Sequence, residues 1–452
     1  VSDAALTLEG LTLTGGRTTA DNDFPDTTNN GGAVRALGDL TLVASTVSGN
    51  STAGDYSDGG GVFGRGDVTL TNSTVSGNST AGDNAPGGGV SGRADVALIN
   101  STVSGNSTAG DNAPGGGVYG RNDVTLTDST VSGNSTAGLG ADGGGARAST
   151  LMVRDSVISG NSSGARSSYT SRGGGLYGES VRVYGSLVED NRLGEYGSGG
   201  GIEGDDVLVE DSTIRGNSGY SGGGIFGGTV RVENSLIDGN SALEANAGGT
   251  GGGIRAGGLE LVASTVSNNR ALGSFSFGGG VVVVGGGSGS LVNSTIAGNV
   301  SEAGGGGLDG GSFRLENTTV TGNSSFGAGG IGAYSDSPEI SLINSVVAGN
   351  AGGDIGGTIL ARTASLVGDD GRQIFADTDE IAPGVFAGVI ADNGGPTPTV
   401  ALLPGGLAID TGDDGLAPAT DQRGVARPQG PASDIGAFEL VPGELGTVLA
   451  AV

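Results

Sequence analysis

A short pattern that recurs along most of the chain constrains its fold more than any other feature. The segment DVTLTNSTVSGN at 67–78 returns as DVTLTDSTVSGN at 123–134, and related segments close on asparagine twelve times. Neighbouring asparagines lie 23 to 30 residues apart. Such a period is typical of a solenoid, in which each repeat buries its apolar side only against its neighbours. The closing residues are Asn50, Asn78, Asn106, Asn134, Asn161, Asn191, Asn217, Asn240, Asn269, Asn299, Asn323 and Asn350.

The apolar positions inside each repeat predict three short strands. In Val68-Thr69-Leu70-Thr71 apolar and polar residues alternate with period two, which indicates a β-strand. Helices are excluded because glycine and β-branched residues dominate and no stretch keeps a period of 3.6. We therefore predict an all-β fold, a parallel β-helix of about twelve coils, each with three strands and stacked about 4.8 Å apart.

The asparagine column has a structural interpretation. A buried asparagine at the same corner of every coil can pair its amide with those above and below, satisfying polar groups that the turn leaves unpaired. A column of serine, which runs from Ser45 to Ser345 with Thr318 as its one substitution, is expected to do the same.

Composition excludes several kinds of chemistry and partner. The chain of 452 residues has no histidine, cysteine or tryptophan, and its 20 basic residues are all arginine. This rules out histidine-based triads, thiol nucleophiles, disulfides and P-loops. A net charge of −28 disfavours nucleic acid, and we expect neither a nucleic-acid partner nor a membrane span.

After Asn350 the repeat stops and proline becomes frequent, so we divide the chain into repeats at 1–350 and a C-terminal region at 351–452. The blocks DNGGPT (392–397), AID (408–410), DQRG (421–424) and DIGAFE (434–439) resemble the carboxy-terminal region of bacterial "choice-of-anchor Q" surface proteins. The glycine clusters, each followed by an aliphatic residue and a later asparagine, resemble polymorphic outer-membrane-protein repeats.

These resemblances imply a secreted, right-handed parallel β-helix on a bacterial surface, with an adhesin-like role and no established reaction. The C-terminal region would cap or extend the solenoid. Relatives of this kind carry an export signal and more sequence before the first coil, whereas this chain starts at Val1, so we expect a processed or trimmed product.

Two sets of charged residues in the C-terminal region are candidate sites. Arg423 lies between Asp421 and Asp434, and an arginine clamped by carboxylates would pin this region onto the last coils. The stretch that starts at Asp410 is similar to a calcium loop, with Asp410, Asp414 and Asp421 as ligands. Its third position is glycine and its twelfth is not glutamate. Calcium at these residues is the one cofactor hypothesis.

An enzyme is not expected, because no cluster of acids or bases breaks the repeat on the predicted strands. Phe63, Tyr119, Tyr177 and Phe226 are predicted at outward positions and could hold sugar rings or a partner. Ser91, Arg147 and Glu203 interrupt this series, which favours an ordinary surface. The loops after the asparagines, such as 79–86 and 241–250, form a variable acidic edge of solvated or ligand-binding loops.

The leading hypothesis is a secreted, extracellular structural protein of the cell surface, adhesin-like, that stacks end to end into filaments. An uncovered solenoid end exposes strand edges, and head-to-tail contact polymerises when it does not close. The apolar end Leu445–Val452 could supply a strand to a neighbour. The partners would be further copies, surface glycans or host and cell-surface proteins. The alternative is a monomeric carbohydrate-binding or carbohydrate-cleaving β-helix.

Overall fold

The predicted all-β parallel β-helix with three strands per coil is confirmed. The structure is a computed structural model that describes residues 5–21, 28–164, 171–194, 197–243, 250–332 and 339–443. The chain divides into two compact units, each a parallel β-solenoid built from three sheets. Unit 1 comprises Val1–Leu208 and Ser212–Gly227, and unit 2 comprises Val209–Asp211 and Gly228–Val452.

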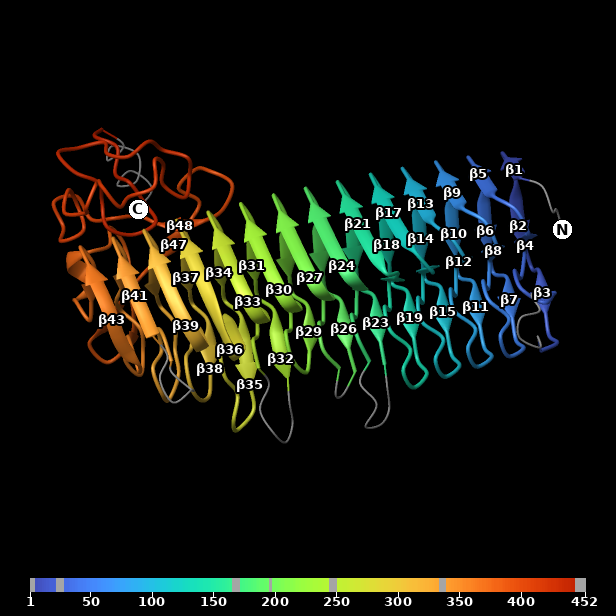
Figure 1. Cartoon of the computed structure of the whole chain (residues 1–452), viewed down its shortest axis with the longest axis horizontal. Coiled ribbons are helices and arrows are strands. Elements are labelled where there is room, and N and C mark those ends of the chain that lie inside the picture. Colours follow the sequence, from blue (N-terminus) through green and yellow to red (C-terminus); the bar gives the residue numbers. More distant parts are fainter. Residues whose placement is uncertain are drawn as a thin grey trace. The chain divides into compact units, whose positions relative to one another are not determined.

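In unit 1 the strands of successive coils pair in parallel and in register (Figure 1). The first sheet contains β1 (Leu6–Glu9), β4 (Val34–Ala36), β5 (Leu40–Val43), β8 (Val62–Gly64), β9 (Val68–Thr71), β12 (Val90–Gly92), β13 (Val96–Ile99), β16 (Val118–Gly120), β17 (Asp123–Thr127), β20 (Ala146–Arg147), β21 (Thr150–Arg154), β24 (Leu176–Tyr184) and most of β27 (Ile202–Glu210). The second contains β2 (Thr12–Thr14), β6 (Thr46–Ser48), β10 (Thr74–Ser76), β14 (Thr102–Ser104), β18 (Thr130–Ser132), β22 (Val157–Ser159), β25 (Leu187–Glu189) and β28 (Thr213–Arg215). The third contains β3 (Arg17–Thr18), β7 (Ser51–Thr52), β11 (Ser79–Thr80), β15 (Ser107–Thr108), β19 (Ser135–Thr136), β23 (Ser162–Ser163), β26 (Arg192–Leu193) and β29 (Ser218–Gly219).

The local sequence explains where the strands face and where the corners form. Val68, Leu70 and Val75 point into the coil and are fully buried, while the residues between them face outward. Left-handed backbone turns the chain at two corners of each coil, at Asn72 (φ 50°) and at Gly77 (φ 61°). Asparagine and glycine are the residues that accept this conformation at least cost.

Unit 2 repeats the same three-sheet arrangement. Its first sheet contains most of β30 (Ile225–Glu233), β33 (Ile254–Val262), β36 (Val281–Val292), β39 (Leu308–Glu316), β41 (Glu339–Ile343) and β43 (Thr358–Thr363). Its second contains β31 (Leu236–Asp238), β34 (Thr265–Ser267), β37 (Thr295–Ala297), β40 (Thr319–Thr321), β42 (Val346–Val347) and β44 (Leu366–Val367), and its third contains β32 (Ser241–Leu243), β35 (Arg270–Leu272) and β38 (Val300–Ser301).

The solenoid extends beyond the expected boundary at residue 350, because β43 and β44 still pair in parallel with β41 and β42. The last first-sheet strand is irregular. A register shift beside Ile340 leaves Leu360 62% exposed, and Arg362 takes the position that Leu342 holds one coil earlier. In the described part of the chain, no further strand pairs with the outer edge of β43.

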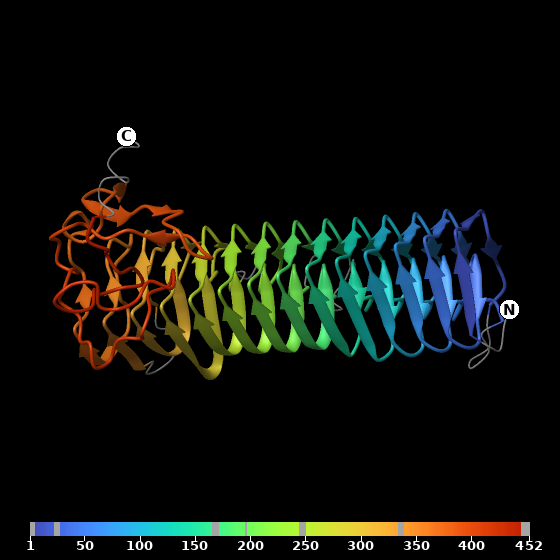
Figure 2. The ribbon, with the colours of Figure 1, turned by 90° about the horizontal axis from the view of Figure 1, so that it is seen from above.

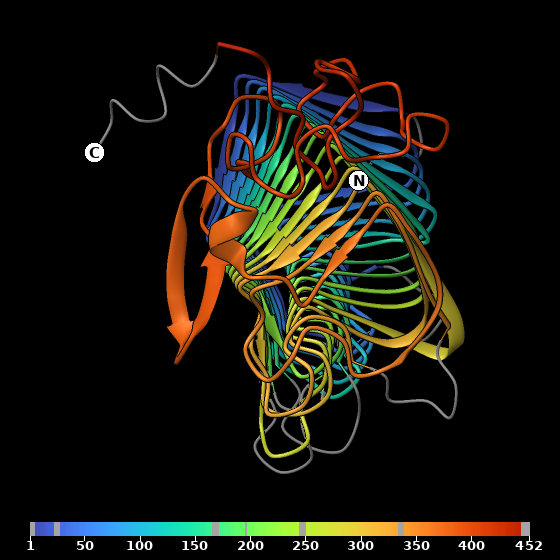
Figure 3. The ribbon, with the colours of Figure 1, turned by 90° about the vertical axis from the view of Figure 1, so that its left-hand side faces the viewer.

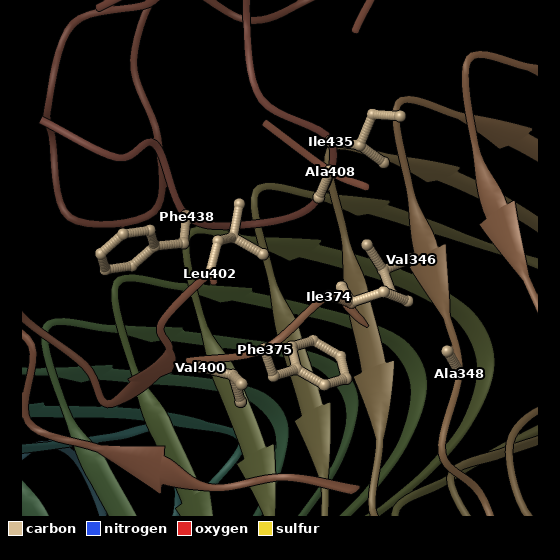
Figure 4. Packing of buried hydrophobic residues seen from close by; sticks show 9 residues of the cluster. All are labelled: Val346, Ala348, Ile374, Phe375, Val400, Leu402, Ala408, Ile435 and Phe438. Atoms are coloured by element: carbon tan, nitrogen blue, oxygen red, sulfur yellow. The ribbon is translucent and has the colours of Figure 1, made fainter. Parts of the chain in front are cut away.

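The rest of the C-terminal region is loop-rich, as predicted. It contains a 3-10 turn, η1 (Gly371–Gln373), and two antiparallel pairs, β45 (Thr378–Ala382) with β46 (Val385–Gly388) and β47 (Ile390–Ala391) with β48 (Thr399–Val400). Figures 2 and 3 show it outside the coils of unit 2. Its buried side chains pack against the outward face of the second sheet (Figure 4), in a cluster of Val346, Ala348, Ile374, Phe375, Val400, Leu402, Ala408, Ile435 and Phe438.

Hydroxyl groups on the same sheet fix the register of this docking. Thr265 Oγ1 donates to Pro398 O at 2.6 Å, and Thr295 Oγ1 donates to Gln422 Oε1 at 2.7 Å. Thr319 Oγ1 accepts from the Ala437 N–H at 3.0 Å. The C-terminal region therefore covers a side of unit 2.

Candidate functional site

The twelve asparagines that close the repeats are buried and form a ladder in each unit. Asn106 is representative: its Nδ2 donates to Asn134 Oδ1 at 2.9 Å and to Val75 O at 3.0 Å. Its Oδ1 accepts from both N and Nδ2 of Asn78 at 2.9 Å. In unit 2 the ladder ends on the carboxylate of Asp354, which accepts from Asn350 Nδ2 at 2.7 Å. These side chains use their polar groups to hold the coils together.

The serine column forms a second ladder at another corner. The Ser73 N–H donates to Ser101 Oγ at 3.1 Å, and Ser73 Oγ donates to Thr71 O at 2.9 Å. In unit 2 the column continues past the asparagines, because the Ser345 N–H donates to Ser365 Oγ at 3.0 Å. Both polar columns are therefore structural.

In the C-terminal region, Arg423 was predicted to be clamped by carboxylates. It forms a buried ion pair with Asp421 (Nε to Oδ2, 2.9 Å). Asp434 has a different role from the one expected, since its carboxylate accepts the N–H groups of Asp410 and Leu440 at 2.8 and 2.7 Å. A second ion pair, between Arg427 NH1 and Glu439 Oε2 at 2.8 Å, has both side chains 1% exposed. Arg427 was not singled out from the sequence; it lies between the matched blocks DQRG (421–424) and DIGAFE (434–439).

The three proposed calcium ligands are not arranged as a metal site. Both oxygens of Asp421 are occupied by Arg423 and by the N–H groups of Val425 and Glu439. Asp414 Oδ1 accepts from the Ser433 N–H at 2.7 Å. Within the described residues, no group of three or more acidic side chains is placed to hold a metal ion.

The acidic loop edge is ordered in unit 1. Asp55 Oδ1 accepts from the Asp83 N–H, and Asp83 Oδ1 accepts from the Asp111 N–H, each at 2.8 Å. These exposed carboxylates stack from coil to coil and satisfy backbone donors. Of the loop at 241–250, residues 244–249 lie outside the described residues, as does the predicted apolar end Leu445–Val452.

A different feature concentrates functional groups in unit 1. Two columns flank each glycine cluster: the residue just before the glycines and the residue after the first aliphatic position. We call this pair of columns the corner row. It contains Asn30, Asp58, Pro86, Pro114, Asp142, Arg172, Ser198 and Ser221 before the glycines, and Arg35, Phe63, Ser91, Tyr119, Arg147, Tyr177, Glu203 and Phe226 after them.

The aromatic residues of the corner row are less exposed than predicted. Phe63 is fully buried, and Tyr119 and Tyr177 are half-buried. The chain bends on both sides of this column, so the glycine corner and the next coil cover the side chain. An added Cβ at Gly59 would lie only 3.1 Å from Phe63 Cβ. The Phe63 side chain therefore lies outside the coil interior but is covered by neighbouring residues.

Tyr119, Arg147 and Tyr177 stack in register on β16, β20 and β24. The Arg147 guanidinium lies 5.5 Å from the Tyr119 ring centroid and 5.7 Å from that of Tyr177. These distances are typical of cation–π contacts. Among the described residues, Arg147 Nε is buried and has no hydrogen-bond partner.

Arg172, Asp142 and Glu203 adjoin this stack. The Arg172 N–H donates to Asp142 Oδ1 at 3.0 Å, and Arg172 Nε lies 3.8 Å from Glu203 Oε1. Arg172 NH1 donates to Tyr177 Oη at 2.6 Å, and Ser198 Oγ donates to Glu203 Oε2 at 2.8 Å. Side chains from successive coils thus meet in one polar cluster.

The environment separates the pKa values of the two acids. Burial raises the pKa of Glu203 to about 8, despite the hydrogen bond from Ser198 and the charge of Arg172. Burial also raises the pKa of Asp142 to about 6, opposed by Arg172 and Arg147. At pH 7 Glu203 is mainly protonated and Asp142 mainly ionised. Two carboxyl groups with different protonation in one cluster are typical of a functional site.

The corner row holds a second, smaller charged group. Asp58 is 5% exposed and lies 3.4 Å from Arg93 NH2, while the Arg93 guanidinium stands 5.7 Å from the Phe63 ring centroid. Burial raises the pKa of Asp58 to about 7. Tyr119, Tyr177 and the residues between them were recognisable in the sequence, but the column before the glycines was not. In that column Pro86 and Pro114 are followed by Asp142 and Arg172, and this change to charged residues is the signal that could have identified the cluster.

Comparisons with protein-family models, curated proteins and solved structures find no match for this chain. In the described residues, no helix has the length and apolar character needed to cross a membrane.

Proposed function

We propose that this chain is an extracellular, adhesin-like structural protein of the cell surface that binds carbohydrate at the corner row of unit 1. The observation that carries this proposal is the cluster around Tyr119, Arg147, Tyr177, Arg172 and Glu203. There, aromatic and ionisable side chains interrupt an otherwise repetitive solenoid.

The solenoid suits a supporting role. Asparagine and serine ladders join every described coil within each unit, so groups on successive coils keep a fixed spacing of about 4.8 Å. A rigid support lowers the entropy cost of binding because its side chains are ordered before the ligand arrives. The extracellular location rests on the resemblance of the C-terminal blocks to secreted surface proteins.

The chemistry of the cluster suits a sugar. Half-buried tyrosine rings offer apolar faces, and their hydroxyl groups remain polar. Arg172, whose side chain is 47% exposed, supplies hydrogen-bond donors beside them. Convergent donors next to an aromatic surface are what recognition of a hydroxyl-rich ring requires.

A glycan array probed with the labelled full chain tests this proposal. We expect selective glycan binding that weakens at least tenfold in Tyr119→Ala and in Tyr177→Ala. Tyr184→Ala is the matched control, because Tyr184 lies on the same strand as Tyr177 and stacks on Arg154 with a distance of 4.8 Å to its ring centroid. Absence of glycan binding, or equal losses in all three variants, would refute the proposal.

Asp142 and Glu203 are two carboxyl groups that both contact Arg172, and this pairing favours glycoside hydrolysis as a second candidate. Glycosidases use a protonated carboxylic acid and an ionised carboxylate on either side of the scissile bond. Release of reducing sugar from a bound glycan, abolished in Glu203→Gln while binding persists, would support it. A glycan recovered intact after prolonged incubation would exclude it.

End-to-end assembly into filaments is a separate hypothesis from carbohydrate binding, and the last coil bears on it. No strand of the described residues pairs with the outer edge of β43, which favours strand addition, whereas the register shift at Leu360 and the charged Arg362 are features that protect sheet edges. Arg362 donates to Ser365 O at 2.9 and 2.7 Å, which holds it in place. We expect monomers in light scattering, and regular fibres in negative-stain electron microscopy would contradict this.

A further inference from the structure

The corner row of unit 1 contains an arginine, Arg147, that forms no ion pair with a carboxylate among the described residues. Arg147 lies between the rings of Tyr119 and Tyr177, and its Nε has no hydrogen-bond partner among the described residues. Buried polar groups in folded proteins are nearly always paired, so an unpaired one needs an explanation. A ligand group that accepts hydrogen bonds would supply the missing partner.

The geometry of the stack prepares Arg147 for a planar anion. Tyrosine rings from the preceding and the following coil lie beside the guanidinium and restrict its rotation. The guanidinium carries N–H groups in a fork that matches a carboxylate with two parallel bonds. The ammonium group of a lysine at the same position would offer no such fork.

The charges around Arg147 also favour an anion. Arg172 is the second cation of the cluster, and its side chain is 47% exposed. Because burial raises the pKa of Glu203 to about 8, Asp142 is the main negative charge among these groups at pH 7. Two arginines against one ionised acid make a locally positive site in a chain of net charge −28. Such a site draws an anionic ligand away from the repulsive remainder of the surface.

A separate arginine–tyrosine contact of unit 1, away from the corner row, provides a comparison. Arg154 lies 4.8 Å from the ring centroid of Tyr184 and is itself exposed. Solvent can satisfy its guanidinium, so it needs no ligand. Of these two arginines, Arg147 alone combines two aromatic neighbours with a buried nitrogen that has no hydrogen-bond partner among the described residues.

We propose that the corner row binds carboxylate-bearing sugars, such as uronic or sialic acid residues, with Arg147 as the carboxylate-binding residue and the tyrosines as the contact for the sugar ring. This inference rests on the proposed carbohydrate function and names its ligand class. The neighbouring Arg172 would bind either the same carboxylate or a ring hydroxyl.

Isothermal titration of the full chain with two matched pairs of probes tests the inference. The pairs are sialyllactose with lactose, and a galacturonic acid trimer with a galactose trimer. At low ionic strength we expect the acidic member of at least one pair to bind tenfold or more tightly than its neutral partner. Added salt should reduce this preference because the attraction is electrostatic.

Variants of Arg147 localise the effect. Arg147→Gln should abolish the preference for the acidic sugar, and Arg147→Lys should lower it severalfold, because lysine keeps the charge but lacks the fork. Arg154→Gln is the matched control and should bind like the parent. Unchanged circular dichroism and melting temperature would show that the variants remain folded.

The outcomes separate the two proposals. Equal affinity for acidic and neutral sugars, or an unchanged preference in Arg147→Gln, would overturn this inference while carbohydrate binding stands. Failure of every probe here and of the glycan array would overturn both.

Discussion

Replacing Asn106 by alanine tests the claim that the asparagine ladder holds the solenoid together. The change removes four hydrogen bonds, two donated by Asn106 Nδ2 and two accepted by its Oδ1. It leaves three buried groups without these partners, namely the N–H and one Nδ2 hydrogen of Asn78 and the carbonyl of Val75. Asn134 Oδ1 loses one bond and keeps the one from the backbone N–H of residue 106. Each unsatisfied buried group costs about 1–3 kcal/mol. Water that enters the space offsets part of this, so we expect a loss of roughly 3–5 kcal/mol.

Asn100→Ala is the control for this experiment. Asn100 is exposed, and its Nδ2 donates one bond to Asn72 Oδ1 at 2.7 Å. Its left-handed backbone (φ 47°) makes alanine unfavourable by roughly 1 kcal/mol. Guanidinium unfolding followed by circular dichroism gives the two free energies, and hydrogen exchange of residues 75–134 shows where protection is lost. A loss in Asn106→Ala no larger than in Asn100→Ala would refute the structural role of the ladder.

Three further predictions concern charge and docking. Burial raises the pKa of Glu203 from its usual 4.5 to about 8, so its ionisation destabilises the folded state increasingly as pH rises through this range. Glu203→Gln should therefore raise the melting temperature near pH 9 and leave it unchanged near pH 4, and equal effects at both would contradict this. The stacked carboxylates around Asp83 repel by about 0.9 kcal/mol per neighbouring pair in water, so sodium chloride should raise the melting temperature, and less so in Asp83→Asn. Gln422→Ala removes bonds to Thr265 and Thr295 and should make residues 371–443 more sensitive to proteases, while unchanged cleavage would show that apolar packing alone holds them.

The coils were predictable because each repeat has the same types of residue in the same order, and these residues have the same structural roles in every coil. Alternation at Val68–Thr71 identifies a strand, and asparagine at a fixed distance identifies a buried corner. Asparagine disappears from the corner after residue 350, yet β43 and β44 extend the solenoid past it, and Ser365 still follows a left-handed residue, Ala364 (φ 42°). The serine ladder outlasts the asparagine ladder.

The corner row could not be assigned from sequence because its environment depends on neighbouring coils. Strand alternation places Phe63 on the outward face, and only the folded corner shows that the position is covered. The same holds for Arg147, whose two tyrosine neighbours lie 28 and 30 residues away along the chain. In the C-terminal region the matched blocks contain the charged residues Asp421, Arg423 and Glu439. The pairing of Arg427 with Glu439 depends on loop geometry, which the sequence does not show.

A crystal structure of the full chain with its tightest-binding glycan tests the proposed function most directly. The account predicts a sugar ring against Tyr119 and Tyr177, with its polar groups within hydrogen-bond distance of Arg147 and Arg172. A glycan bound instead at the acidic loops around Asp83, with the corner row unchanged, would contradict it.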